Sequence, residues 1–450
     1  MINKINLREL ILEILLEISK TGEYSHLVLR DTLEKYQYLE KQERAFIARV
    51  CEGTLEYRLR LDYIIDQFST VPTEKMKPVI RELLRNSVYQ LLYMDRVPDS
   101  AVCNEAVKLA RKRGFYNLAG FVNGVLRKIA REYSSVQFPG KDQPEEYLSV
   151  IYSVPVWLVR EFVERFGFET AEKIFEAFLE EKRTTVRIRE SGVSKEEVLE
   201  SLRRQKVEVE EAPYARDAYY LKNYDHLPAL AAFREGKIQV QDVSSMLVAD
   251  AADPKAGDYV IDLCAAPGGK ALCIADKMHG TGTVDARDIS EYKTELILDN
   301  ASRQHLENVK VSVMDASVLD PRSLEKADIL IADVPCSGWG VIGRKADIKY
   351  NTSPGAVAEL AALQRKILEQ AATYVKPGGT LIYSTCTLTR EENTDNVRWF
   401  AEHFPYELDS LDPFLCEELR SSETREGYLQ LLPGVHACDG FFIARFKRKK

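Results

Sequence analysis

A chain of 450 residues, of which 45% are hydrophobic, is long and apolar enough to fold into two or three globular domains. Its apolar runs fall short of the roughly 18 residues of a membrane-spanning helix, and Glu9, Glu13 and Glu17 interrupt the N-terminal pattern, which argues against a signal peptide. A net charge of −8 argues against a uniformly basic nucleic-acid-binding protein.

The eight cysteines form no CxxC pair and have no histidine at the spacing of metal ligands. The sequence therefore predicts reduced thiols and no metal site. We expect a cytoplasmic protein without membrane attachment. Nothing in the pattern indicates an obligate protein partner, so a monomer is expected.

Residues 1–140 are expected to form an all-helical domain, because apolar side chains recur there at the i, i+3, i+4, i+7 spacing of amphipathic helices. Within 81–131 the sequence holds 10 basic and 4 acidic residues. Such an excess is most often a solvated helix surface, but it is also typical of a patch that binds nucleic-acid phosphates. The pieces "ERAFIARVCEGTLEYRLRLDYII" (43–65) and "FVNGVLRK" (121–128) resemble the NusB-like RNA-binding helical domain.

A polar stretch with Pro and Gly, residues 134–147, indicates a linker. Residues 148–235 then mix amphipathic helix patterns with short strand patterns such as "TTVRIRE" (184–190). A small α+β subdomain is expected there. Its pattern alone indicates no function.

From residue 236 to 450 the pattern alternates between strands and helices. Strand-like apolar runs occur at 258–263, 282–288, 309–315, 327–333, 379–385 and 440–446. Such alternation is typical of a mostly parallel, doubly wound α/β sheet. We therefore expect a Rossmann-like domain over 236–450.

Acidic residues stand at the ends of these runs. Asp288, Asp315 and Asp333 lie at or near the last residue of their runs, and Asp262 lies one residue before the end of its own. Because parallel strands end at one edge of the sheet, these carboxylates are expected to face one crevice. A single Asp there is more often a helix cap, but three in successive strands favour a ligand with several hydroxyl and amino groups.

The turn "CAAPGGK" (264–270) follows the first run. Gly268 and Gly269 let a ligand approach the backbone, but the turn is neither G-x-G-x-x-G nor a P-loop. This disfavours a pyrophosphate-binding site and hence a nicotinamide dehydrogenase. Asp288 lies about 20 residues beyond the glycines, where an acid commonly binds ribose hydroxyls. A nucleoside cofactor without a pyrophosphate fits best.

Two cysteines also lie in turns after strands. In "YSTCTLTREEN" the strand is predicted to stop at Cys386, and Thr389 and Glu392 have the spacing of a capping box, which predicts a helix from about Thr389. Cys336 occupies the equivalent turn in "ADVPCSGWG". The helix dipole at such a position favours a thiolate, so both are candidate nucleophiles, and spacing alone does not rank them. The remaining cysteines of this region are expected to be small buried hydrophobes: Cys264, Cys273, Cys416 and Cys438.

In this order, "VIDLCAAPGGK" (260–270), "ADVPCSGWG" (332–340) and "YSTCTLTREEN" (383–393) resemble the RNA cytosine-5 methyltransferases. With the NusB-like front end, the chain is similar to their RsmB branch, and the resemblance extends over nearly the whole chain. It implies S-adenosylmethionine as the cofactor, no metal, and methylation of C5 of a cytosine. The implied substrate is 16S rRNA or a small-subunit precursor, with cytosine 967 as the family's target.

The resemblance also implies roles for single residues. Cys386 would attack C6 of the cytosine and Cys336 would assist product release, while Asp333 would contact the cytosine edge with support from Lys270. Residues implied in cofactor binding are Cys264, Ala265, Ala266, Pro267, Gly268, Gly269, Lys270, Asp288 for the ribose, Asp315 for the adenine region, and Asp333. A covalent bond suits this chemistry, because C5 is a poor nucleophile until the ring's conjugation is broken.

Arg344, Lys345 and Lys349 follow the Pro-Cys motif, and we expect them to contact RNA phosphates. Two other functions stay open: the same chemistry on tRNA or another rRNA cytosine, and a noncatalytic RNA-binding factor. The intact Asp333 and cysteines count against the latter. The sequence does not identify the target nucleotide, the maturation state of the RNA that is recognised, or the contribution of the N-terminal domain to affinity.

Overall fold

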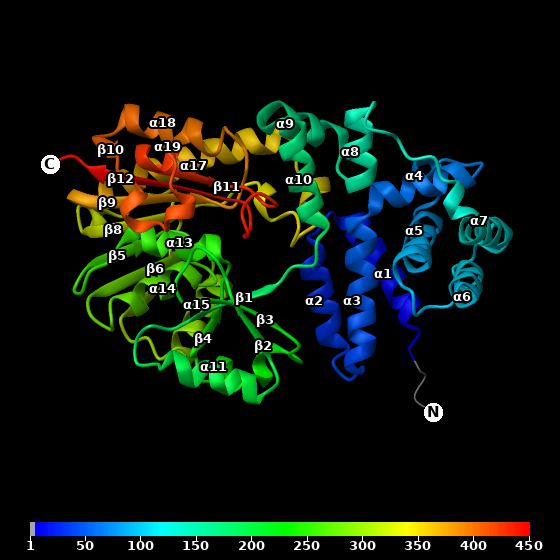
Figure 1. Cartoon of the computed structure of the whole chain (residues 1–450), viewed down its shortest axis with the longest axis horizontal. Helices are drawn as coiled ribbons and strands as arrows, with labels where there is room; N and C mark the ends of the chain where they lie inside the picture. Colours follow the sequence, from blue (N-terminus) through cyan, green and yellow to red (C-terminus); the bar gives the residue numbers. More distant parts are fainter. Residues whose placement is uncertain (1–4) are drawn as a thin grey trace. The chain divides into compact units, whose positions relative to one another are not determined.

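The computed structural model describes residues 5–450, and the chain divides into two compact units. The first holds the residues up to Glu180 together with Ile342–Asn351; the second holds Glu181–Val341 and Thr352–Lys450. Figure 1 follows the chain from the N-terminal helices to the last strands. Among residues 5–450, no helix has both the length and the apolar character that crossing a membrane requires. The predicted boundaries at 140, 148 and 236 stay predictions.

The first unit consists of helices, as predicted for the N-terminal domain. They are α1 (Leu7–Thr21), α2 (Ser25–Lys35), α3 (Lys41–Glu56), α4 (Arg58–Phe68), α5 (Pro78–Tyr93), α6 (Asp99–Lys112), α7 (Ala119–Glu132), α8 (Pro144–Tyr152), α9 (Val156–Phe166) and α10 (Phe168–Leu179). The Asn6 side chain accepts from two amides of the first turn and so begins α1. The apolar stripes of α1, α3 and α5 meet in one core, where Leu15, Ile47 and Leu84 are fully buried.

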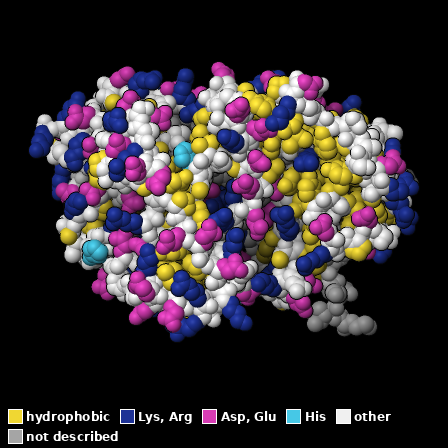
Figure 2. All heavy atoms as spheres, viewed as in Figure 1, with side chains coloured by type: hydrophobic (Ala, Val, Ile, Leu, Met, Phe, Trp, Pro, Cys, Tyr) yellow, Lys and Arg dark blue, Asp and Glu magenta, His cyan; other side chains and the backbone are white. Residues whose placement is uncertain are grey.

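The basic excess of residues 81–131 is partly paired within this unit. Lys112 and Arg113 lie 2.6 Å and 3.3 Å from the Glu9 carboxylate, and Lys108 lies 2.7 Å from Glu105. On the face drawn in Figure 2, Lys and Arg side chains are interspersed with Asp and Glu. For these basic residues the contacts favour a solvated, ion-paired helix surface.

The segment Ile342–Asn351 packs among these helices, although its sequence neighbours belong to the second unit. Asp347 accepts a hydrogen bond of 2.6 Å from the amide of Ser25, at the start of α2. Lys349 donates one of 2.8 Å to the carbonyl of Glu56, at the end of α3. The segment is therefore fixed by helix termini of the first unit.

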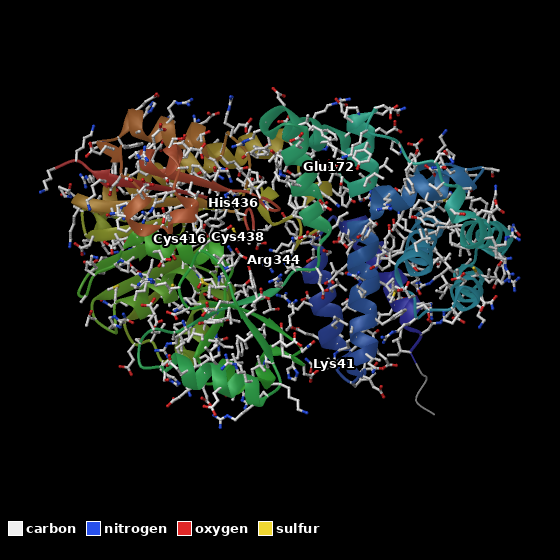
Figure 3. All side chains as sticks on the ribbon, viewed as in Figure 1. Lys41, Glu172, Arg344, Cys416, His436 and Cys438 are labelled. Carbon is white, nitrogen blue, oxygen red and sulfur yellow. The ribbon has the colours of Figure 1, made fainter. Side chains whose placement is uncertain are left out.

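The predicted contact between Lys349 and RNA phosphates is wrong. Lys349 is only 1% exposed, and its ammonium lies on a backbone carbonyl inside the helical unit. The sequence pattern of a basic loop did not distinguish a buried lysine from an exposed one. Arg344 and Lys345 are exposed, and their RNA contact stays a prediction; Figure 3 labels Arg344.

A small antiparallel sheet begins the second unit. Its order is β2 (Glu208–Glu211), β3 (Ala218–Lys222), β1 (Thr184–Ile188) and β4 (Ile238–Val240), and α11 (Lys195–Arg204) follows β1 in the chain. Arg187 of β1 donates a hydrogen bond of 2.7 Å to Asp276, and both side chains are buried. This ion pair attaches the small sheet to the helix that carries Asp276.

The large sheet has the order β10-β12-β9-β8-β5-β6-β7, with β11 paired to β12. Strands β5 to β9 are parallel: β5 (Tyr259–Asp262), β6 (Thr283–Asp288), β7 (Val309–Val313), β8 (Ala327–Asp333) and β9 (Val375–Thr385). Antiparallel pairing adds β10 (Tyr406–Leu408), β11 (Tyr428–Leu431) and β12 (Phe441–Arg448). The six predicted runs and the mostly parallel sheet are confirmed; the short β10 and β11 were not predicted.

Helices cover both faces of this sheet (Figure 1). Val260 and Ile331 pack on one face with helices α13 (Val243–Ala252), α14 (Gly269–Lys277) and α15 (Glu291–Arg303). Their strand neighbours Ile261 and Leu330 pack on the other face with α17 (Pro354–Tyr374) and α18 (Thr394–His403). Because adjacent strand residues point to opposite faces, apolar runs without alternation produce this doubly covered sheet.

Candidate active site

The predicted acids, lysine and cysteines meet where the parallel strands end. Asp262 at the end of β5 is in register with Ile331 of β8, and Asp333 at the end of β8 is in register with Ser384 of β9. The turns that follow these strands therefore lie at one edge of the sheet, where open α/β sheets bind ligands.

Asp288 ends β6 and holds the turn 264–270. One carboxylate oxygen accepts a hydrogen bond of 3.0 Å from the amide of Ala266. The other accepts one of 2.8 Å from Ile289 and lies 3.0 Å from the Lys293 ammonium. The predicted cofactor acid thus also fixes the predicted cofactor turn.

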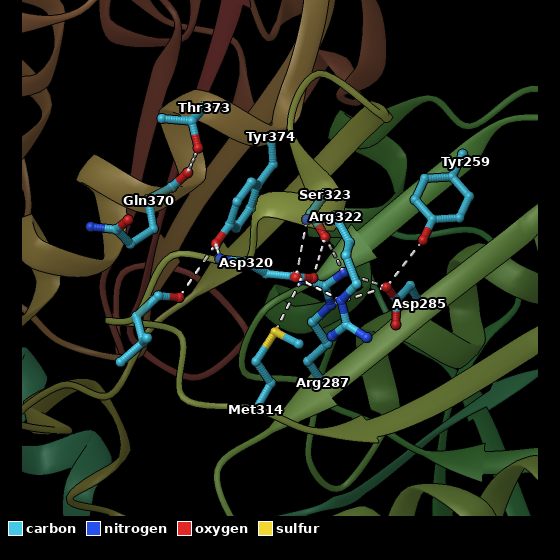
Figure 4. Close-up of polar contacts among 11 residues, drawn as sticks. Tyr259, Asp285, Arg287, Met314, Asp320, Arg322, Ser323, Gln370, Thr373 and Tyr374 are labelled. Atoms are coloured by element: carbon cyan, nitrogen blue, oxygen red, sulfur yellow. Dashed lines mark hydrogen bonds and ion pairs between the residues drawn. The ribbon is translucent and has the colours of Figure 1, made fainter.

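A buried polar cluster on the opposite side of β6 positions Asp288 (Figure 4). The Arg287 guanidinium donates to Asp285 at 3.0 Å and to Ser323 at 2.6 Å, and Tyr259 donates to Asp285 at 3.1 Å. Because successive strand residues point to opposite faces, this anchoring of Arg287 directs Asp288 toward the crevice side. The alternating polar residues of "VDARD" are the signal of this arrangement in the sequence.

Asp315 lies two residues beyond β7 and beside Asp288, because Met314 donates its amide to the Asp288 carbonyl at 2.8 Å. The Asp315 carboxylate accepts hydrogen bonds of 2.9 Å and 2.7 Å from the amide and hydroxyl of Ser317, and these bonds lower its pKa. The side chain is exposed, so a ligand can reach it.

Lys270 and Asp333 form an ion pair of 2.6 Å, as the resemblance implied when it placed them in one cluster. The second Asp333 oxygen accepts a hydrogen bond of 2.8 Å from Ser384. Burial opposes the charge on Lys270, but the charges of Asp333 and Asp262 outweigh it and raise the pKa of the lysine. Lys270 therefore stays protonated, although its side chain is only 14% exposed.

Asp262 is a residue whose role the sequence analysis left unassigned. It is buried, and neither carboxylate oxygen has a hydrogen-bond partner. Burial, and next the negative charge of Asp333, raise its pKa to about 7. An unpartnered buried carboxyl group marks a place where a ligand supplies the missing donor.

Cys336 and Cys386 come together, although 50 residues separate them. Their sulfurs lie 3.2 Å apart, within hydrogen-bond distance. The following residues are joined as well, because the hydroxyls of Ser337 and Thr387 are 2.6 Å apart. The hydrogen bond to Cys386 and burial raise the pKa of Cys336 well above its ordinary value, so Cys336 holds its proton.

The other cysteines of the second unit differ in burial. Cys273 is fully buried, and burial raises its pKa. Cys416 and Cys438, both labelled in Figure 3, are partly buried and pack against the cluster on the α14 face, and the partly buried Cys264 packs against the opposite cluster. The prediction of a small buried hydrophobe is confirmed for Cys273, whereas the other three are only partly buried.

The helix predicted from about Thr389 begins instead at Thr394, after Asn393. Glu392 is fully buried and accepts hydrogen bonds of 2.7 Å from Thr389 and 2.9 Å from the amide of Ser337. The predicted pairing of Thr389 with Glu392 exists, but it joins side chains within a loop. Glu392 thereby connects the loops of Cys336 and Cys386, a role that the local pattern did not reveal.

The turn 264–270 fits a nucleoside cofactor with a charged end. Gly268 has φ +106°, a conformation that favours glycine, and α14 begins at Gly269 without a side-chain cap. Free amides of a helix's first turn bind anionic groups. Among residues 5–450, no group of His, Cys, Asp and Glu side chains has an arrangement that could hold a metal ion.

Three family models match consecutive parts of the chain. The NusB family matches residues 5–131, the RsmF/B-like ferredoxin-like domain matches 154–225, and the 16S rRNA methyltransferase RsmB/F matches 249–447. The expected all-helical NusB-like domain, small α+β domain and C-terminal methyltransferase domain agree with these matches.

Full-length relatives agree with this order. The probable ribosomal RNA small subunit methyltransferase B of Bacillus subtilis is 39% identical over 99% of both chains. The corresponding protein of Synechocystis is 31% identical over 99% of this chain and 100% of its own. The crystal structure of PH0851 is similar with a TM-score of 0.81 and 26% identity, over 99% of both chains.

Proposed function

This chain belongs to the family of the 16S rRNA methyltransferase RsmB/F, and on that premise we propose that it methylates C5 of a cytosine in 16S rRNA. The family makes it an S-adenosylmethionine-dependent rRNA methyltransferase. The position on the base, the covalent route and the roles of single residues are our proposal. Cytosine 967 is the proposed target, from the resemblance to the RsmB branch.

The observation that carries the proposal is the contact of 3.2 Å between the sulfurs of Cys336 and Cys386 beside the Lys270–Asp333 ion pair. A methyl transfer to an oxygen or an amine needs no thiol. C5 of cytosine does need one, because a nucleophile must first add to C6 before C5 can attack an electrophile. Two thiols at the crevice therefore favour carbon as the acceptor.

The pair divides into two roles. Cys336 holds its proton, since hydrogen bonding and burial raise its pKa, and the family resemblance assigns the attacking thiolate to Cys386. Lys270 is charged, and its charge and that of the Cys386 sulfur attract each other. We therefore assign the attack on C6 to Cys386 and assistance in product release to Cys336.

The bound cofactor supplies an electrophilic methyl group. Cys386 forms the S–C6 bond, which makes C5 electron-rich, and Asp333 hydrogen-bonds the N3/N4 edge of the base to stabilise the adduct. After C5 has gained the methyl group, a base takes the C5 proton, the electron pair of that C–H bond forms the C5=C6 double bond, and the S–C6 bond breaks with its electron pair returning to the Cys386 sulfur. Asp288 is proposed to bind the ribose, Asp315 the adenine region, and the turn 264–270 the amino-acid end.

Mapping of 5-methylcytosine in 16S rRNA tests the proposal. Purified protein, cofactor and unmodified transcript are incubated, and bisulfite sequencing locates the product. We expect one modified cytosine with the wild type and none with Cys386→Ala. Methylation of tRNA but not of 16S rRNA would select the second substrate class, and undiminished activity of Cys386→Ala would disprove the covalent route.

A second variant tests the two thiol roles. In Cys336→Ala, release is expected to fail while attack proceeds, so the protein should stay bonded to RNA. A denaturing gel would then show a slower band that requires both cofactor and RNA. Cys416→Ala is the matched control, because Cys416 is also partly buried but packs against the cluster on the α14 face, and it should give no such band. Normal turnover by Cys336→Ala would remove the assigned role.

A further inference from the structure

Gln241 carries an amide group that has no partner in the structure. The side chain is only 6% exposed, and neither its amide nitrogen nor its amide oxygen forms a hydrogen bond. Its backbone is held firmly, because its amide donates a hydrogen bond of 3.1 Å to Thr185. Leaving a buried polar group unpaired costs about 1–3 kcal/mol of stability. An unpartnered buried glutamine therefore indicates either a missing ligand or a residue that only destabilises the fold.

The amide of Gln241 lies against the start of α14. A side-chain carbon built on Gly269 would be 3.8 Å from both the amide carbon and the amide nitrogen of Gln241. Gly269 is the first residue of this nine-residue helix, and Gly268 before it provides no side-chain cap. The Gln241 amide therefore lies beside the first residue of α14, whose first-turn amides have no side-chain cap.

We propose that Gln241 binds the α-amino-acid group of S-adenosylmethionine. Its amide NH₂ donates to the carboxylate together with the first-turn amides of α14, and its amide oxygen accepts from the ammonium group. This inference rests on the proposed function and names a residue for the charged end of the cofactor.

The chemistry of the two unpaired atoms selects this group. A carboxylate or phosphate alone only accepts hydrogen bonds and would leave the glutamine oxygen unpaired. An amino-acid group offers acceptors and donors side by side, which matches an amide. Asp262, two residues before the turn, has two further unpaired oxygens that suit the same ammonium.

Two cofactor fragments separate this role from a structural one. S-adenosylhomocysteine keeps the amino-acid group, whereas 5′-methylthioadenosine lacks it and keeps the adenosine part. We expect Gln241→Met to weaken S-adenosylhomocysteine about tenfold or more and to leave 5′-methylthioadenosine unchanged, both measured by isothermal titration calorimetry. Asp288→Ala should weaken both ligands, since it holds the ribose side.

Gln239 is the matched control. It is equally buried, but its amide oxygen accepts from Arg303 and, at 3.2 Å, from Gln304. Gln239→Met should therefore lower the thermal stability of the ligand-free protein and preserve the ratio of the two affinities. Gln241→Met should keep or raise that stability, because it removes an unpaired polar group.

The outcomes separate the inference from its premise. Wild-type protein that binds neither ligand would contradict the proposed cofactor. If the wild type binds both, an equal loss with both ligands or no loss in Gln241→Met overturns the role of Gln241. A fall in stability as large as that of Gln239→Met would overturn it as well.

Discussion

Two lysines show how differently the two units treat a charge. Lys270, in the crevice of the large sheet, has a side chain that is 14% exposed; it lies 2.6 Å from Asp333, and its pKa is raised. Lys349, among the helices of the first unit, is 1% exposed; it donates a hydrogen bond of 2.8 Å to the carbonyl of Glu56, and burial lowers its pKa to about 7 although the charge of Glu56 opposes that shift. The ion pair compensates the charge of Lys270, whereas burial outweighs the attraction of Glu56 at Lys349.

The difference teaches that burial of a titratable group does not by itself mark a functional site. Around Lys270, two further buried side chains, Asp262 and Gln241, keep unpaired polar atoms at the end of the sheet. Lys349 instead completes the end of helix α3 and fixes the segment Ile342–Asn351. Several buried side chains with unpaired polar atoms indicate a functional site. A buried lysine that hydrogen-bonds a backbone carbonyl indicates a structural role.

The largest expected effect breaks the pair in the crevice. Lys270→Met removes the counter-charge of Asp333, whose side chain is 23% exposed, so the cost should be below the value of about 3–5 kcal/mol for a fully buried pair. We expect methyl transfer to fall about 100-fold or more in a tritiated-methyl assay. Lys277→Met, at the other end of α14, also removes a paired lysine and should retain most activity. Equal losses in both would show that the effect is on folding.

Removal of Asp288 is expected to have the next largest effect. Asp288→Ala removes the proposed ribose contact and the hydrogen bond to Ala266 that holds the cofactor turn. The affinity for S-adenosylhomocysteine should fall about tenfold or more by calorimetry. Asp315→Ala, which leaves the turn intact, should cost less. An Asp288→Ala protein with wild-type affinity would contradict the placement of the cofactor.

Lys349→Met tests the other side of the comparison through the pH dependence of stability. In the unfolded chain Lys349 has a pKa of 10.5 and is protonated below that pH. In the folded protein its pKa is about 7, so the lysine stays neutral until the pH falls to about 7. Stability from this group is thus complete above about pH 10.5 and is lost as the pH falls toward 7. The variant should be more stable than the wild type at neutral pH, and the gain should vanish at alkaline pH. Melting curves across this range decide it.

The smallest expected effect concerns the exposed cations of the same segment. Arg344→Ala and Lys345→Ala should each weaken RNA binding by less than about 1 kcal/mol and lower the salt dependence by about one ion. Filter binding at several salt concentrations measures both quantities. Lys349→Met should leave the salt dependence unchanged, since its ammonium does not reach solvent. A change in the salt dependence of RNA binding by Lys349→Met would show that Lys349 does contact RNA.

Local patterns carried much of the fold. The runs that end at Asp262 and Asp333 carry successive apolar residues, and such runs suffice to predict a sheet covered on both faces. The run that ends in Asp288 instead carries the polar Asp285 and Arg287. The short strands β10 and β11 were missed, because a strand of three or four residues leaves no periodic pattern and is stabilised only by pairing with β12. The helix start near Thr389 was misplaced for a similar reason, since the buried Glu392 bonds Ser337 of a distant loop instead of capping a helix.

The sequence alone determined the order of the domains, the turn 264–270, the acids at the strand ends and the two candidate cysteines, because each depends on neighbours within about a dozen residues. Only the tertiary structure decided that Cys336 and Cys386 touch, that Lys349 is buried, and that Gln241 and Asp262 have unpaired atoms. These properties depend on which distant side chains remove a group from water and whether they supply a partner. No local pattern encodes that balance.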